Sequence, residues 1–139
     1  MSFEHGRMSP QYTKQLKDHM KYWSFIVLLV ASCNLNMAYE KRITKGYYLI
    51  ATDAMDQLDI SRELETGDYI GRIPAIVRAY AVVNDTLIFA RTTAGYYVLN
   101  TARDHDFAEV EDVVVGPLDQ ATFKRNWLNQ YNVKFKSPE

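Results

Sequence analysis

The fold is decided by the stretch Ile76-Val77-Arg78-Ala79-Tyr80-Ala81-Val82-Val83-Asn84-Asp85-Thr86-Leu87-Ile88-Phe89-Ala90-Arg91. Two runs of apolar residues, rich in β-branched side chains, flank an Asn-Asp dipeptide, and both of these residue types tolerate the positive φ values of a type I′ turn. The pattern predicts an antiparallel hairpin with a two-residue turn. In that register Ala81 faces Ile88 and Arg78 faces Arg91, so we expect a small, aliphatic face that suits packing against a helix.

Further strand signals occur on both sides of this hairpin. Runs of aromatic, β-branched or alternating residues, most of them bounded by Gly, Asp or Pro, lie at 46–52, 56–64, 69–73, 96–100 and 110–115. The run over 56–64 is also compatible with a short helix, and we favour the strand. Asp119 is a good N-cap for a helix over 120–131, whose Phe123, Trp127 and Tyr131 form an aromatic stripe expected to dock on the sheet. We therefore expect an α+β fold, with an antiparallel β-sheet of about five to six strands and one C-terminal helix packed on it.

Composition limits the class of protein. The chain has 139 residues, of which 47% are hydrophobic and 24% charged, and this fits one globular domain. The net charge of -1, without a block of basic residues, argues against a nucleic-acid partner. The single cysteine excludes an internal disulfide framework and a cysteine-rich zinc site.

The first third of the chain has the layout of an export signal. Residues 1–22 are polar and carry four basic and two acidic side chains, and residues 23–33 then read WSFIVLLVASC. This apolar run is too short to cross a bilayer core of about 30 Å as a helix, but it has the length of a signal-peptide h-region. A helix in a protein core would show a polar face at 3.6-residue spacing, and this run shows none.

The end of that run, Val30-Ala31-Ser32-Cys33, resembles the lipobox of bacterial lipoproteins. The resemblance implies that Cys33 receives a diacylglyceryl thioether and that the chain is cleaved before it. Asn34 in place of Asp would favour transfer to the outer membrane in a Gram-negative host. The expected organisation is a lipoprotein signal peptide over 1–32, a lipidated tether over 33–45 and a small α+β domain over 46–139. The processed chain would have a net charge of -3.

The folded part carries a second, looser resemblance. The succession IGRIPAIVRAYAVVNDTLIFAR, YYVLN and VVVGPLDQATFKRN is similar to a group of small bacterial lipoproteins without an assigned activity, over roughly residues 46–131. It implies a small α+β domain with an antiparallel sheet, and it transfers no catalytic residues.

The residues that could carry chemistry form no catalytic set. We predict no catalytic, metal or cofactor-binding residues: His105 lies between two aspartates without a second His or Cys nearby, and we expect a solvated loop there. Asp53, Asp56 and Asp59 lack the rest of a calcium loop. Two arginines facing each other across a hairpin repel unless an acid lies between them, so Arg78 and Arg91 are candidate contacts for a carboxylate or phosphate, with an internal ion pair as the alternative.

These observations favour a non-enzymatic lipoprotein of the bacterial cell envelope, anchored to a membrane through Cys33. Its domain would bind a protein or an envelope component, without nucleic acid or cofactor. The alternative is a cytosolic interaction or immunity-type protein in which residues 23–33 belong to the core. A small hydrolase or inhibitor that uses Arg78 and Arg91 is a third class.

Overall fold

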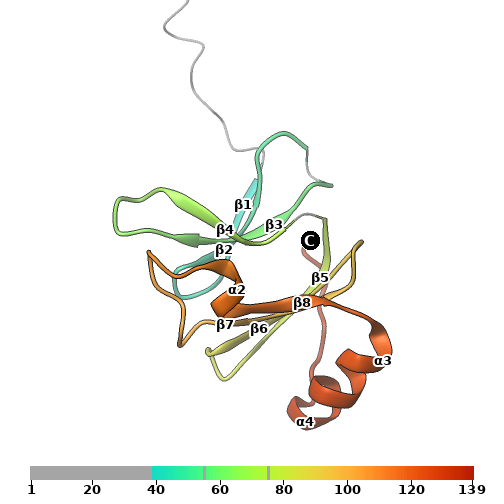
Figure 1. Cartoon of the computed structure of the whole chain (residues 1–139). Coiled ribbons are helices and arrows are strands. Elements are labelled where there is room, and N and C mark those ends of the chain that lie inside the picture. Colours follow the sequence, from blue (N-terminus) through green and yellow to red (C-terminus); the bar gives the residue numbers. More distant parts are fainter. Residues whose placement is uncertain (1–38, 55, 75) are drawn as a thin grey trace, which may run out of the picture. The chain divides into compact units, whose positions relative to one another are not determined.

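A computed structural model describes residues 39–54, 56–74 and 76–139 (Figure 1). The strands are β1 (Tyr39–Thr44), β2 (Tyr47–Ala51), β3 (Asp59–Glu63), β4 (Tyr69–Ile73), β5 (Val77–Val83), β6 (Leu87–Thr92), β7 (Tyr96–Asn100) and β8 (Val114–Leu118). The helical segments are α2 (Val110–Val113), α3 (Gln120–Phe123), η1 (Lys124–Leu128) and α4 (Asn129–Tyr131). The predicted signal peptide, 1–32, and the predicted lipidation site, Cys33, lie outside the described residues.

The described strands form two antiparallel sheets of four, in the orders β1-β2-β3-β4 and β5-β6-β7-β8. The expected α+β fold with a single sheet of five to six strands is therefore wrong: the described part of the chain is mostly β. The ladder breaks between β4 and β5, at Pro74, which has no N–H to donate to a neighbouring strand. The second half of the chain then forms a sheet of its own, and the two sheets bury their apolar faces against each other.

The strand missing from the sequence prediction is β1. Its sequence, Tyr-Glu-Lys-Arg-Ile-Thr, contains three charged residues and lies within the tether predicted over 33–45. In the structure β1 pairs with β2 along its length, from Tyr39 opposite Ala51 to Thr44 opposite Tyr47. It lies at the edge of its sheet, where charged side chains are common because they discourage pairing with other chains. The folded domain therefore includes residues before 46.

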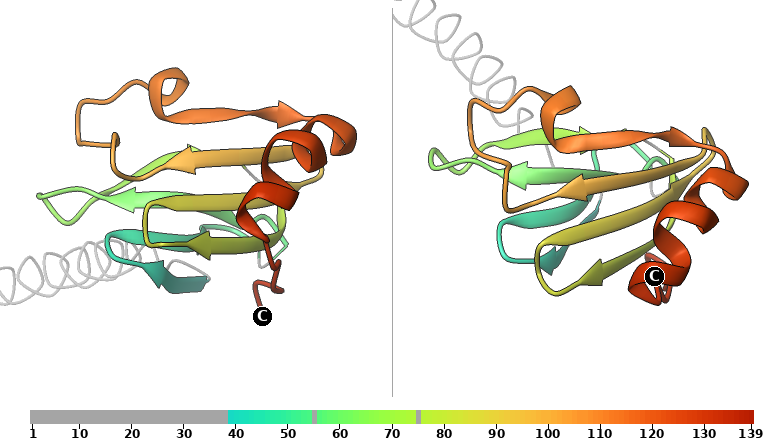
Figure 2. Two further views of the ribbon diagram at one scale, coloured as in Figure 1. Left: turned by 90° about the horizontal axis from the view of Figure 1, so that it is seen from below. Right: turned by 60° about the horizontal axis from the view of Figure 1, so that its bottom comes forward.

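The second sheet has a different kind of core on each of its faces. Between the two sheets the side chains are mainly aliphatic, and Leu49, Ile60, Ile88 and Leu99 are fully buried there. On the opposite face the helix packs through aromatic rings: the ring of Phe89 lies 5.8 to 6.1 Å, centroid to centroid, from three rings of the predicted stripe, Phe123, Trp127 and Tyr131. Figure 2 shows this helix lying across the β5–β8 sheet.

The C-terminal helix is confirmed over Gln120–Tyr131, with a π-helical turn at its centre. The Asp119 side chain caps its start by accepting a hydrogen bond of 2.9 Å from the backbone N–H of Thr122. This bond lowers the pKa of the Asp119 carboxyl. Asn132 ends the helix in the left-handed conformation, with φ of 48°.

The hairpin predicted over 76–91 forms, but its register differs by one residue from the predicted one. Its turn has three residues instead of two, and the first two, Asn84 and Asp85, have φ of 53° and 55°. Ala81 therefore pairs with Phe89, not with Ile88. A slip of one residue moves side chains to the other face of a strand, so the face that meets the helix is partly aromatic.

The predicted strand over 110–115 is also partly wrong. Val110–Val113 form the short helix α2, and β8 begins at Val114 and continues through Gly116 and Pro117 to Leu118. None of the helices within the described residues is long and apolar enough to span a membrane.

Candidate functional site

The two arginines proposed as anion contacts are not paired across the hairpin. Arg91 pairs with Ala79, while Arg78 falls at an irregularity of the ladder between Val77 and Ala79. Both are exposed. Arg78 lines a pocket of about 400 Å³ together with Asp56 and the C-terminal residues Ser137, Pro138 and Glu139, and Arg91 is not part of that lining. The structure therefore does not bring the two candidates into one site.

A different arginine is the centre of the most elaborate polar cluster. Arg72, on β4, donates from Nε to Oδ2 of Asp104 over 3.0 Å, and its Nη2 lies 2.7 Å from Oδ1 of the same carboxylate. Both side chains are shielded from solvent, with exposed fractions of 1% and 0%. The remaining guanidinium donors bind the carbonyl oxygens of His105, at 2.9 Å, and Ala108, at 3.2 Å. One strand side chain thus binds three residues of the loop that follows β7.

Tyr47 completes this buried cluster from β2, by donating its hydroxyl to Asp104 Oδ2 over 2.9 Å. Burial, followed by the hydrogen bond to this carboxylate, raises the pKa of the Tyr47 phenol well above its ordinary value. Asp104 Oδ1 makes no well-aligned hydrogen bond within the described residues, so its partner is the charge of Arg72. A buried carboxylate is tolerated because it faces an opposite charge and accepts hydrogen bonds.

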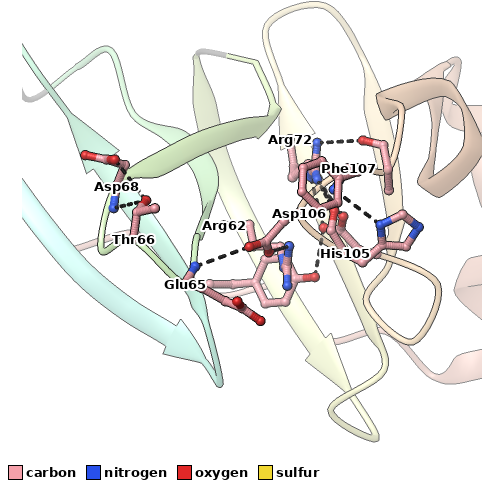
Figure 3. A network of polar contacts seen from close by, with 11 residues as sticks. Arg62, Glu65, Thr66, Asp68, Arg72, His105, Asp106 and Phe107 are labelled. Atoms are coloured by element: carbon pink, nitrogen blue, oxygen red, sulfur yellow. Dashed lines mark hydrogen bonds and ion pairs between the residues drawn. The ribbon is translucent and has the colours of Figure 1, made fainter.

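A second, more exposed ion pair holds the same loop two residues further on. Arg62, on β3, pairs with Asp106, whose other oxygen accepts a hydrogen bond of 3.3 Å from the backbone N–H of Glu65 (Figure 3). About a fifth of each side chain in this pair is exposed. The hydrogen bond from Glu65, then the contact with Arg62, lower the pKa of the Asp106 carboxyl.

Between these contacts the loop presents an exposed aromatic ring. Phe107 is 91% exposed, although the residues on both sides of it are fixed: Asp106 by Arg62, and Ala108 by its packing on the core between the sheets. The Phe107 backbone N–H bonds to Nδ1 of His105 over 3.3 Å. Beside the ring lies a hollow of about 350 Å³, lined by Arg103, His105, Phe107, Ala108, Glu109, Asp112 and Val113.

In the Asp-His-Asp sequence at 104–106, both aspartates form ion pairs with arginines of the domain. The two carboxylates bind different arginines, Arg72 and Arg62, so they do not converge on His105, which is exposed. Within the part of the chain that the structure describes, no three His, Cys, Asp or Glu side chains gather as metal ligands. The expectation of a solvated loop holds for His105 and is wrong for Asp104, which is buried.

The other aspartates singled out in the sequence do not form one cluster either. Asp53 and Asp56 are exposed, and Asp59, on β3, accepts a hydrogen bond of 2.8 Å from the Ser61 hydroxyl. Burial raises the pKa of the Asp59 carboxyl.

Sequence reasoning missed Arg72 and the burial of Asp104. One signal was present: Arg72 is the one charged residue in the strand Tyr69–Ile73. A charge at such a position needs a partner if the strand is buried, but the residue that supplies it is 32 positions away in the sequence.

Comparison of the chain with protein-family models, with curated proteins and with solved structures gives no match. The functional argument therefore depends on the residues and their geometry.

Proposed function

We propose that this chain is a lipid-anchored binding protein of the bacterial cell envelope, whose domain presents the loop 101–109 to a partner. The observation that carries the binding role is Phe107, an exposed aromatic ring on a loop held by two ion pairs. Ordering a flexible loop on binding costs free energy, so a loop that is already fixed favours affinity. Aromatic side chains are enriched at the centres of protein interfaces.

The anchoring role rests on the lipobox-like segment Val30–Cys33. The order of features in the sequence, which is a basic lead, an apolar run without helical periodicity, small residues and the single cysteine, supports a leader distinct from the domain over the alternative in which residues 23–33 belong to its core.

The start of β1 limits how far the domain can lie from such an anchor. Five residues, 34–38, separate Cys33 from Tyr39, so the two Cα atoms are at most about 20 Å apart in a fully extended chain. This span is shorter than the one expected from a tether reaching residue 45. A lipid on Cys33 would therefore keep the domain close to the membrane surface.

In this proposal the loop lies near the end of β1 opposite to the end that would be anchored. Tyr39 begins β1 opposite Ala51, whereas Tyr47, which binds Asp104, lies opposite Thr44 at the other end of this strand. A strand of six residues is roughly 17 to 20 Å long. In Figure 1 the β1–β2 turn and the loop before α2 lie on the same side of the domain. The anchored end and the loop end are thus distinct.

The test of anchoring is the intact mass of the protein purified from membranes of its host. We expect a chain that begins at Cys33 and carries the mass of two or three acyl groups. A Cys33→Ser variant should keep its leader and carry no acyl mass. A membrane-purified chain that still begins at Met1 without added mass would contradict the proposal.

The test of the binding role uses Phe107→Ser in the anchored protein. The variant should fold as stably as the wild type, because the ring is exposed, and should lose the partners that co-purify with the wild type. Ala94→Ser, in the exposed turn between β6 and β7, is the matched control. Equal recovery of every partner by wild type and Phe107→Ser would contradict a role for this loop.

A further inference from the structure

The surface around Phe107 has a composition that restricts its partner. The large hydrophobic residues that are exposed in the described part of the chain, Phe107, Val110 and Val115, all fall within residues 107–115. We call these residues and the hollow beside Phe107 the 107–115 surface. Isolated exposed valines are common, but an almost fully exposed phenylalanine beside a hollow indicates a contact surface.

The charged residues within 107–115 are acidic. Glu109, Glu111 and Asp112 alternate with the hydrophobic residues, and all three are exposed. They take part in none of the ion pairs found among the described residues, which join Arg62 to Asp106 and Arg72 to Asp104. The surface therefore combines exposed hydrophobic side chains with carboxylates that form no ion pair among the described residues.

The hollow beside the ring has the same character. Glu109 and Asp112 contribute two carboxylates and Arg103 contributes one guanidinium, so the carboxylates of the hollow outnumber its guanidinium group. Its volume of about 350 Å³ is ample for one long side chain. A lysine or arginine side chain entering it would meet the two carboxylates and lie near the Phe107 ring, whose face attracts cations.

We infer that the 107–115 surface binds a protein partner through an apolar patch bordered by lysine or arginine, with one basic side chain entering the hollow. This inference deepens the binding role proposed above and does not depend on the lipid anchor. Charge complementarity selects this occupant. Anionic lipid headgroups would be repelled by the acidic residues, and a second copy of this chain would bring two acidic surfaces together.

The test uses a photo-reactive phenylalanine analogue, p-benzoylphenylalanine, in place of Phe107 in the full chain expressed in its host. We expect a cross-link to one protein, within a peptide that contains lysine or arginine beside apolar residues. The same analogue at Ala94 is the control and should give no such product. Placing the analogue at Val110 provides a second position if the change at 107 disturbs the loop.

Reversing the charge of acidic residues on this surface then tests whether the cross-linked partner is held by them. Glu109→Lys combined with Asp112→Lys should lower the yield of the cross-link at least fivefold. Asp53→Lys combined with Asp56→Lys makes the same change of charge at exposed residues outside this surface and should leave the yield unchanged. Circular dichroism of each variant checks that the β-fold is intact.

Several results would overturn the inference: no product above the Ala94 control, a cross-link to lipid, a cross-link to a second copy of this chain, or a yield that survives the charge reversal. A product with a partner whose contact peptide is acidic would also overturn it, while leaving the proposed binding role in place. Failure of the anchoring proposal is recognised separately, by the intact mass.

Discussion

Asp104 and Asp106 lie two residues apart in one loop and each binds an arginine, yet their surroundings are opposite. Asp104 and its partner Arg72 are shielded from solvent, whereas about a fifth of the side chains of Asp106 and Arg62 is exposed. One loop therefore holds a charge that is shielded from solvent and, two residues further on, a charge that is partly exposed. His105 and Phe107, on either side of Asp106, are exposed.

Breaking the buried pair should have the largest effect. Arg72→Met leaves the Asp104 carboxylate buried without an opposite charge, and we expect the free energy of unfolding to fall by about 3 to 5 kcal/mol. Urea denaturation measures this change. Adding Asp104→Leu removes the uncompensated charge and should recover most of the loss. If Arg72→Met alone unfolds at the wild-type urea concentration, the pair has no structural role.

Tyr47→Phe should have an intermediate effect. It removes the hydroxyl that donates to Asp104 but keeps the ring, so we expect a loss of about 1.5 kcal/mol. The raised pKa of Tyr47 also predicts a pH dependence. The folded state resists loss of the phenol proton, so this contribution is complete below the unfolded pKa of 10.0 and decreases as the pH rises above it.

The measurement for Tyr47 is urea denaturation of the wild type and Tyr47→Phe over a series of alkaline pH values. The difference in stability between them should shrink as the pH rises above about 10, because phenylalanine has no proton to lose. A constant difference would show that Tyr47 does not titrate differently in the folded and unfolded states.

Arg62→Met should cost less than Arg72→Met. Partly exposed ion pairs are weak because water and salt screen the charges, and we expect a loss of less than about 1 kcal/mol. Raising the salt concentration should reduce this loss further, whereas the effect of Arg72→Met should be nearly independent of salt. Equal losses in the two variants would contradict the distinction between buried and exposed pairs.

The smallest expected effect is the acid dependence of Asp106. Its pKa is below the ordinary value of 3.8, so its contribution to stability is complete above that value and decreases as the pH falls below it. Wild type should therefore be more stable than Asp106→Asn at about pH 6, and this advantage should decrease at about pH 3. An advantage that is the same at both pH values would contradict the lowered pKa.

The local elements were largely predictable because their signals are local. The helix from Gln120 to Tyr131 follows from the Asp119 cap and the spacing of its aromatic residues, both confirmed by the structure. The strands that contain Tyr47, Val98 and Phe89 were recognisable from apolar runs bounded by turn residues.

The errors arose where a choice depends on distant parts of the chain. The Asn-Asp dipeptide is compatible with a turn of two or three residues, and the packing of Phe89 against the helix accompanies the longer turn. β1 looked like a tether because an edge strand needs few apolar residues. The sequence prediction lacked β1 and placed no break at Pro74, so it gave one sheet where the structure has two.

The candidate site was less predictable than the fold. The anion contact proposed for Arg78 and Arg91 was based on a register that does not form. A loop around His105 was expected, but its anchoring to Arg72 and Arg62 was not, because residues 32 and 44 positions apart carry no mutual signal in one sequence. The Cys33 hypothesis lies outside the described residues and stays a prediction.

By itself, the sequence determined most of the extended segments, apart from β1 and the start of β8, and where the C-terminal helix begins and ends, because caps, turns and apolar runs act over a few residues. The tertiary structure decided the division into two sheets, the register of the central hairpin, and which aspartate is buried. Those outcomes depend on burying apolar faces and pairing charges between residues far apart in the chain, and such pairing is determined when the whole domain folds.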